Sequence, residues 1–180
     1  MIKPADIKTV ILGIGNILLG DEGIGIHVIK RIEKITLADN VKVIDGATAG
    51  FGLLPIFKTY QNSKFIIVDA LKVSSPDNQN SKSENIGYEK GGIYKIPLTD
   101  IYDLCSSNYL KYGFTSLHQT GLIDVLSLFH ATYKTKITGY IIGVNIFDRK
   151  KDSTLSFSMN LSPQIEKKVP EIIKIVKKLI

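Results

Sequence analysis

The 180-residue chain has a single cysteine, Cys105, and this scarcity limits what sulfur can do here. One thiol cannot form an internal disulfide, and it cannot build a metal cluster made only of cysteines. No histidine lies near Cys105 in the sequence, so a thiol nucleophile activated by an imidazole has little support. We therefore expect a reducing, cytoplasmic setting and a site that does not depend on sulfur.

Long apolar runs are also lacking. No run approaches the roughly 18 to 20 residues that are needed to span a bilayer. The first residues, MIKPADIKTV, lead straight into a strand-like segment without the apolar region and cleavage site of a secretory leader. The sequence thus predicts a protein that neither spans a membrane nor is secreted.

Arginine is rare although the chain is basic. The formal net charge is +6, yet Arg31 and Arg149 are the only arginines and lysine supplies the rest. Arginine is the residue best suited to bidentate contacts with phosphate and guanine. Many of the lysines fall where a helix would present a solvated face. We therefore expect no nucleic-acid partner, and we interpret the charge as serving solubility or an acidic partner.

Short apolar runs alternate with helical patterns along most of the chain. Runs rich in β-branched residues are typical of strands buried on both faces of a sheet. Strands are predicted at residues 7–14, 41–45, 64–71, 92–96 and 137–144, with the run at 92–96 at an edge. Helices are predicted at residues 23–35, 51–60, 116–131 and 162–180. This alternation predicts one α/β domain over residues 1–180, a three-layer α/β/α fold with a mostly parallel, open, twisted sheet of about five strands.

Two segments carry further local signals. Ser162 and Pro163 suit the start of the last helix, whereas Pro170 should kink or interrupt it because proline cannot donate a backbone hydrogen bond. Residues 73–90 are polar and poor in apolar side chains, which predicts a surface loop.

Acidic residues follow three of the predicted strands. The first strand is followed by glycines and then by Asp21 and Glu22, the second ends at Asp45, and the third contains Asp69. Ligands of open α/β sheets gather at the carboxyl ends of the strands. The pattern therefore predicts that acidic side chains converge on one edge of the sheet.

A dinucleotide site is the first alternative for this edge. Its fingerprint is G-x-G-x-x-G, but Gly13 and Gly15 are followed by Asn-Ile-Leu, so the third glycine is absent. Asp21 and Glu22 would also repel a pyrophosphate from the helix start that it should occupy. No phosphate-binding G-x-x-x-x-G-K-[ST] motif occurs either. Charge therefore argues against a nucleotide.

A metal site is the second alternative. Asp21 is expected to cap the following helix, which would leave Glu22 to point elsewhere. Ser116 and Gln119 have capping-box spacing, which would place His118 in a first helical turn, where the neutral, metal-ligating form is favoured.

Glu22, Asp69 and His118 would together make a three-ligand site for a divalent transition metal. The spacing alone leaves a second interpretation open. Glu22 would then only cap the helix, and His118 would only hydrogen-bond to nearby backbone.

The strings GIGNILLGDEGIG, DGATAG, IIVDA and SLHQTGLIDVL occur in this order, and together they resemble the hydrogenase maturation endopeptidases. The final LSPQIEKKVPEIIKIVKKLI is also similar to the last helix of that family. The resemblance implies an endopeptidase that removes the C-terminal extension of a nickel-iron hydrogenase large-subunit precursor in the cytoplasm. It implies that cleavage follows nickel insertion, so that the nickel is carried by the precursor.

The resemblance also implies which residues carry the activity. The metal-binding and catalytic positions of the family map onto Glu22, Asp69 and His118. The implied substrate-binding positions are Asn16, Asp45, Gly46, Thr48 and Gly50. One departure concerns the exit of the last strand, where the family often has a Gln-Pro pair and this chain has Asn145 in GVNIFDRKK.

Other functions are compatible with the same motifs. One is a maturation chaperone that binds the nickel-loaded precursor without hydrolysis, and another is a peptidase of the same fold with different substrates. Nothing in the sequence indicates the oligomeric state or the particular hydrogenase.

Overall fold

The computed structural model describes residues 2–48, 50–71, 90–106, 121–146 and 157–180, and it contains one five-stranded sheet in the order β2-β1-β3-β5-β4. The strands are β1 (Thr9–Gly13), β2 (Val41–Asp45), β3 (Lys64–Leu71), β4 (Ile93–Pro97) and β5 (Thr138–Asn145). Four strands run parallel, and β4 pairs antiparallel with β5 at one edge. The predicted open, mostly parallel sheet is confirmed, as is the edge position of its fourth strand.

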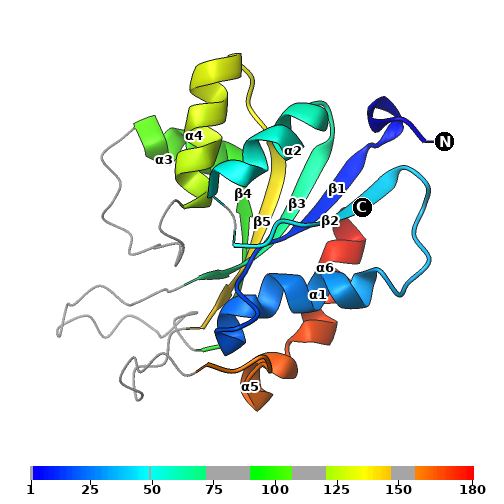
Figure 1. The fold of residues 1–180 in the computed structure, drawn as a ribbon, viewed down its shortest axis with the longest axis vertical. Coiled ribbons are helices and arrows are strands. Elements are labelled where there is room, and N and C mark those ends of the chain that lie inside the picture. The colour runs from blue at the N-terminus through cyan, green and yellow to red at the C-terminus, as the bar shows by residue number, and fades with distance from the viewer. Residues whose placement is uncertain (1, 49, 72–89, 107–120, 147–156) are drawn as a thin grey trace.

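Helices cover both faces of this sheet (Figure 1). They are α1 (Ile24–Ile32), α2 (Leu53–Thr59), α3 (Leu98–Ser106), α4 (Leu122–Tyr133), α5 (Pro163–Glu166) and α6 (Val169–Leu179). The helices α1, α5 and α6 pack on one face, and α2, α3 and α4 pack on the other. The three-layer α/β/α prediction is therefore confirmed. No helix in the described part of the chain is long and apolar enough to cross a membrane.

The two central strands are buried on both faces, because their side chains alternate between two apolar clusters. In β1, Val10 and Leu12 join the cluster under α2, α3 and α4, whereas Ile11 joins the cluster under α1 and α6. Phe65 and Ile66 in β3 divide in the same way. This period of two is what an extended strand imposes on its side chains.

Three details differ from or refine the sequence pattern. The interruption expected at Pro170 is confirmed, since α5 ends at Glu166 and α6 begins at Val169 with the proline in its first turn. The short helix α3 was not predicted, although Leu98, Ile101, Tyr102 and Cys105 follow the helical spacing i, i+3, i+4 and i+7. The start at residue 116 that was predicted for the helix over residues 116–131 is wrong for α4, which begins at Leu122 after the extended Gly121.

Candidate active site

The strand order reverses beside β1, and this reversal determines where a ligand can enter. β1 lies between β2 and β3, and Gly13 at its end pairs with Asp45 on one side and Val68 on the other. The connection after β1 runs over one face through α1, and the connection after β2 runs over the other through α2. The crevice outside such a switch point is the usual ligand site of an open α/β sheet. Asp45 and Asp69 therefore flank the end of β1.

Two glycines allow the chain after β1 to lie directly on the strand ends. A Cβ atom added to Gly25 would lie 2.2 Å from the carbonyl oxygen of Ile14 and 2.3 Å from that of Val68. A Cβ atom on Gly15 would lie 2.3 Å from the carbonyl oxygen of Glu22. Gly25 thus provides the close helix–strand packing that the third fingerprint glycine provides in dinucleotide-binding folds. The dinucleotide fingerprint places that glycine at position 18, which is Leu18 in this chain.

Glu22 lies in the short 3-10 turn η2 (Gly20–Gly23), which packs against β3. Its exposed fraction is 8%, and that of Asp69 is 2%. Burial raises the pKa of the Asp69 carboxyl from 3.8 to about 8; the hydrogen bond that Asp69 accepts from the N–H of Ala70 opposes the rise, and the charge of Glu22 adds to it. The structure therefore brings two of the three predicted metal ligands together in a buried place.

A buried pair of carboxylates fits a divalent cation, which would relieve both the desolvation and the mutual repulsion. The third predicted ligand, His118, lies outside the described residues, and so do the Ser116 and Gln119 of its predicted capping box. Within the described part of the chain, no three His, Cys, Asp or Glu side chains are grouped in a way that could hold a metal. The role of His118 therefore stays a prediction.

Asp21 does not cap a helix, so this prediction is wrong. Neither η2 nor α1 has a side-chain cap, and the Asp21 carboxylate instead binds residues far along the chain. Its Oδ1 accepts a hydrogen bond from the Ser162 N–H at 2.6 Å, and its Oδ2 accepts one from the Ser162 hydroxyl at 2.8 Å. Oδ2 also forms an ion pair with Lys90 Nζ at 2.6 Å. We call Asp21, Ser162 and Lys90 the Asp21 clamp.

The loop after β2 is tied to the loop after β1 by backbone hydrogen bonds. The Gly46 N–H donates to the carbonyl of Gly13, and the Gly15 N–H donates to the carbonyl of Ala47, both at 2.8 Å. The exposed Asp45 accepts a hydrogen bond from the Ala47 N–H and supports the turn there, where φ is +48°. Two of the predicted substrate-binding positions, Asp45 and Gly46, thus belong to this pair of joined loops.

The remaining predicted substrate positions lie around the same loops. Asn16 is half-buried, and its Oδ1 accepts a hydrogen bond from the Leu18 N–H at 3.0 Å. Thr48 is exposed and Gly50 is half-buried in the turn that precedes α2. Sequence reasoning did not single out Leu18 and Phe51, whose exposed fractions are 50% and 59%. The sequence signal that could have found them is the position of these large apolar residues within or directly after the loop motifs GNILLG and DGATAG.

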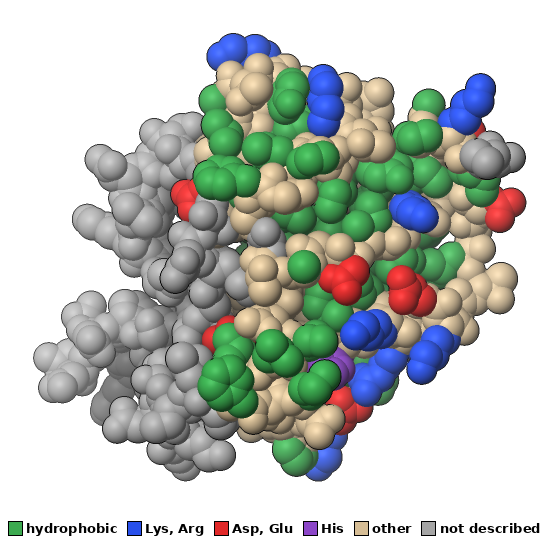
Figure 2. All heavy atoms as spheres, viewed as in Figure 1, with side chains coloured by type: hydrophobic (Ala, Val, Ile, Leu, Met, Phe, Trp, Pro, Cys, Tyr) green, Lys and Arg blue, Asp and Glu red, His purple; other side chains and the backbone are tan. Residues whose placement is uncertain are grey.

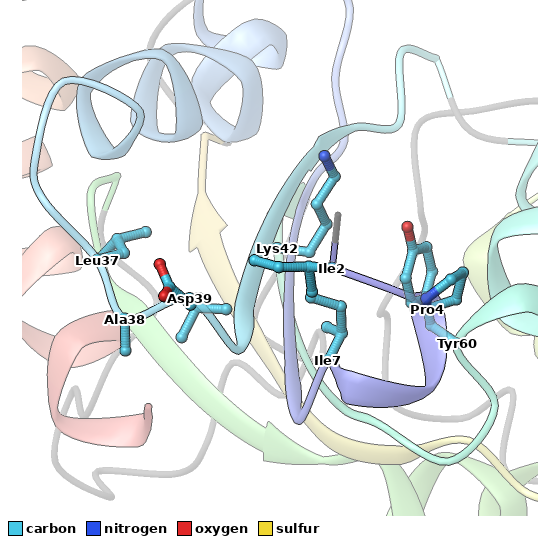
Figure 3. A pocket seen from close by; sticks show the side chains of 9 residues that line it. Ile2, Pro4, Ile7, Leu37, Ala38, Asp39, Lys42 and Tyr60 are labelled. Carbon is cyan, nitrogen blue, oxygen red and sulfur yellow. The ribbon is translucent and has the colours of Figure 1, made fainter.

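The opposite end of the sheet has a different character. An open pocket of about 360 Å³ lies there, at the amino ends of β1 and β2 (Figure 3). Its lining includes Ile2, Ile7 and Tyr60, together with Asp39 and Lys42. On the face of the molecule in Figure 2, lysine and arginine side chains are scattered and mixed with acidic ones rather than gathered into one patch.

Comparison with known proteins points to one family. A family model described as hydrogenase maturation protease (HycI) matches residues 26–76. A protein of Methanocaldococcus jannaschii named for a hydrogenase maturation protease is 30% identical over 167 residues, which cover 92% of this chain and 92% of that protein. The chain belongs to the hydrogenase maturation protease family. The resemblance noted in the sequence is thereby confirmed.

Other members of the family extend the comparison. The hydrogenase 2 maturation protease of Escherichia coli is 32% identical over 142 residues, covering 76% of this chain and 72% of that protein. The structure of the E. coli endopeptidase HybD matches with a TM-score of 0.65 at 26% identity, covering 94% of this chain and 90% of that one. Coverage is lower for HupD of Rhizobium leguminosarum, of which the chain spans 60%.

One relative carries a different kind of name. A coenzyme F420 hydrogenase subunit delta of Methanothermobacter thermautotrophicus is 25% identical over 177 residues, covering 96% of this chain and 94% of that protein. Membership of the hydrogenase maturation protease family thus supports a peptidase activity for this chain. One relative that matches over nearly its whole length is named as a hydrogenase subunit instead.

Proposed function

We propose that this hydrogenase maturation protease is an endopeptidase that removes the C-terminal extension of a nickel-iron hydrogenase large-subunit precursor in the cytoplasm. The observation that carries the proposal is the buried pair Glu22 and Asp69 at the switch point of the sheet. Two buried acidic side chains at a switch point offer oxygen ligands to a divalent metal. A structure that keeps them there in a protease family supports a function that brings a metal to this point.

In this proposal the metal arrives with the substrate. Glu22, Asp69 and His118 contact nickel that the precursor already holds, so only a nickel-loaded precursor places its cleavage site correctly. A divalent metal beside the scissile bond is a Lewis acid that polarises the carbonyl or activates a water molecule. Nickel is therefore treated as part of the substrate rather than as a resident cofactor.

The joined loops after β1 and β2 are proposed to hold the precursor beside the metal. Asn16 lies in the loop after β1. Asp45, Gly46, Thr48 and Gly50 lie at the end of β2 and in the connection that follows it. Exposed Phe51 follows directly and offers apolar contact area next to these polar groups. An extended peptide needs this combination of backbone donors, acceptors and apolar contacts.

The test is cleavage of a hydrogenase large-subunit precursor, prepared with and without nickel, followed by mass spectrometry of the released C-terminal peptide. We expect release only from the nickel-loaded precursor. Equal release from both preparations would contradict recognition of nickel. A parallel reaction with an unrelated protein that carries an exposed C-terminal tail controls for unspecific proteolysis.

A second candidate is a maturation chaperone that binds the nickel-loaded precursor without cutting it. The observation that favours it is the relative named as a hydrogenase subunit rather than as a protease. Stable binding of the nickel-loaded precursor without release of any peptide would support the chaperone and contradict the endopeptidase.

A further inference from the structure

The residues Asp21 and Glu22 are neighbours in η2, but they serve different parts of the molecule. Glu22 is buried beside Asp69 at the end of the sheet. Asp21 binds Ser162 and Lys90, which lie in segments distant along the chain. Of these two adjacent residues in one tight turn, Glu22 therefore belongs to the candidate site and Asp21 anchors the turn.

The anchors of Asp21 are themselves fixed to the framework. Ser162 is the residue that precedes α5, and the buried Ile165 of α5 belongs to the apolar cluster beneath α1. Lys90 precedes Gly91, whose N–H donates to the carbonyl of Asn145 at the end of β5. The amide of Gln164 also donates to the Lys90 carbonyl at 2.8 Å. The Asp21 clamp thus connects η2 to α5 and to the carboxyl end of the sheet.

The clamp is partly shielded from water, which strengthens it. The exposed fractions of the Lys90 and Asp21 side chains are 17% and 13%, whereas the exposed Lys168–Glu171 pair has 40% and 55%. Ion pairs at the surface contribute little, and pairs with less water and additional hydrogen bonds hold their geometry better. The ion pair of Asp21 is shielded from water in this way, and Ser162 adds two hydrogen-bond donors to it.

We propose that Asp21 is a positioning residue that, through Ser162 and Lys90, holds η2 so that Glu22 stays beside Asp69. The turn needs such an anchor because neither η2 nor α1 has a side-chain cap of its own. The backbone hydrogen bonds of Glu22 itself are long: its N–H donates to the carbonyl of Leu19 at 3.3 Å, and its carbonyl accepts from the Asn16 N–H at 3.2 Å. The shorter bond, from the Gly20 N–H to the Ser158 carbonyl at 2.6 Å, ties the turn to the same C-terminal segment as the Asp21 clamp. Asp21 acts through Glu22 and does not touch the substrate. The inference rests on the proposed function, in which Glu22 meets the nickel of the precursor.

The experiment compares D21N, K90M and K90R with E171Q as the matched control. E171Q removes a carboxylate from an exposed lysine pair and changes none of the three residues of the clamp. Amide hydrogen exchange over residues 16–24 reports the turn directly. Single-turnover cleavage of nickel-loaded precursor at saturating enzyme reports the position of Glu22, and the affinity for the precursor is measured separately.

We expect D21N to speed exchange in residues 16–24 and to slow cleavage by about 10- to 100-fold, the range known for residues that orient metal ligands. K90M should slow cleavage by a smaller factor than D21N. K90R should cleave faster than K90M because arginine can still form an ion pair with Asp21. Affinity for the precursor should change little, which a general loss of folding would not reproduce. E171Q should match the wild type in each measurement.

The outcomes separate this inference from the proposed function. Wild-type cleavage by D21N, while E22Q loses activity, would overturn the positioning role and leave the proposed function intact. Wild-type cleavage by E22Q would remove the role of Glu22 and overturn both. If K90R were as slow as K90M, the ion pair would not be part of the positioning.

Discussion

The two ends of the sheet are built from the same strands, yet they differ in how they treat charge. At the carboxyl end, Glu22 and Asp69 are buried side by side, and hydrogen bonds tie the loops around them to one another. At the amino end, Asp39 and Lys42 are exposed around an open pocket (Figure 3). Exposed charge costs little, whereas a buried carboxyl group is costly to ionise. This difference supports the proposed site at the carboxyl end.

The largest expected effect tests this difference with the same chemical change at both ends. We expect E22Q and D69N to slow cleavage of nickel-loaded precursor by at least about 100-fold, because each removes a charge from the point where the metal arrives. D39N, at the amino end, should stay within about twofold of the wild type, as surface changes usually do. Single-turnover rates measure both. If D39N cleaved the precursor much more slowly than the wild type, the amino end of the sheet would take part in the function, which contradicts the proposed site.

The next effect sharpens the comparison by separating the tight and open parts of the carboxyl end. G25A places a Cβ within 2.3 Å of two backbone oxygens, so we expect a loss of about 3 kcal/mol in the free energy of unfolding. G52A meets nothing within 4 Å, and its φ of −59° suits alanine, so a gain of about 0.4–1 kcal/mol is expected. Urea unfolding measures both. If G25A and G52A changed the free energy of unfolding equally, α1 would not pack tightly against the strand ends at Gly25.

The third effect concerns the pH dependence of stability in the metal-free protein. The pKa of Asp69 is raised from 3.8 to about 8 on folding, so between these values the folded protein binds a proton that the unfolded chain has released. The contribution of Asp69 to the free energy of unfolding therefore falls as the pH rises through this window.

The D69N variant has no such proton to lose. Its stability relative to the wild type should grow between about pH 5 and pH 8, by on the order of a few kcal/mol at most. Thermal or urea unfolding at several pH values measures the difference. A difference that is constant across this range would show that Asp69 is ionised in the folded protein throughout.

The smallest effect is expected at the amino end. K42A removes an exposed charge beside the open pocket, and we expect a change within about 0.5 kcal/mol in the free energy of unfolding and no loss of cleavage. Unfolding and cleavage assays run with the other variants provide the comparison. A strong loss of cleavage with normal stability would assign a binding role to this pocket.

Local patterns in the sequence predicted the framework well. The bounds of β2 and β3 agree with the predicted residues 41–45 and 64–71, because short β-branched runs between polar stretches are a strong strand signal. Parallel strands end at one edge, which is why strand ends alone were enough to bring Glu22 and Asp69 into the same neighbourhood. The family resemblance used the same motifs and added the chemistry.

The parts that were missed depend on contacts between distant segments. Asp21 was expected to cap a helix because capping is the local use of an aspartate at a helix start. Its actual partner, Ser162, lies 141 residues away, and no local pattern reports such a pair. The packing role of Gly25 is hidden for the same reason, since the atoms that it approaches belong to Ile14 and Val68.

The Asp21 clamp has a consequence for how the protein is made. The turn that carries Glu22 is synthesised early, but Ser162 and the Ser158 carbonyl that binds the Gly20 N–H belong to the end of the chain. Chains are made from the N-terminus, and early segments can begin to fold before later ones exist. Until these residues have been made, the turn that carries Glu22 lacks both contacts. The protease would therefore gain its ordered site only once synthesis has passed Ser162.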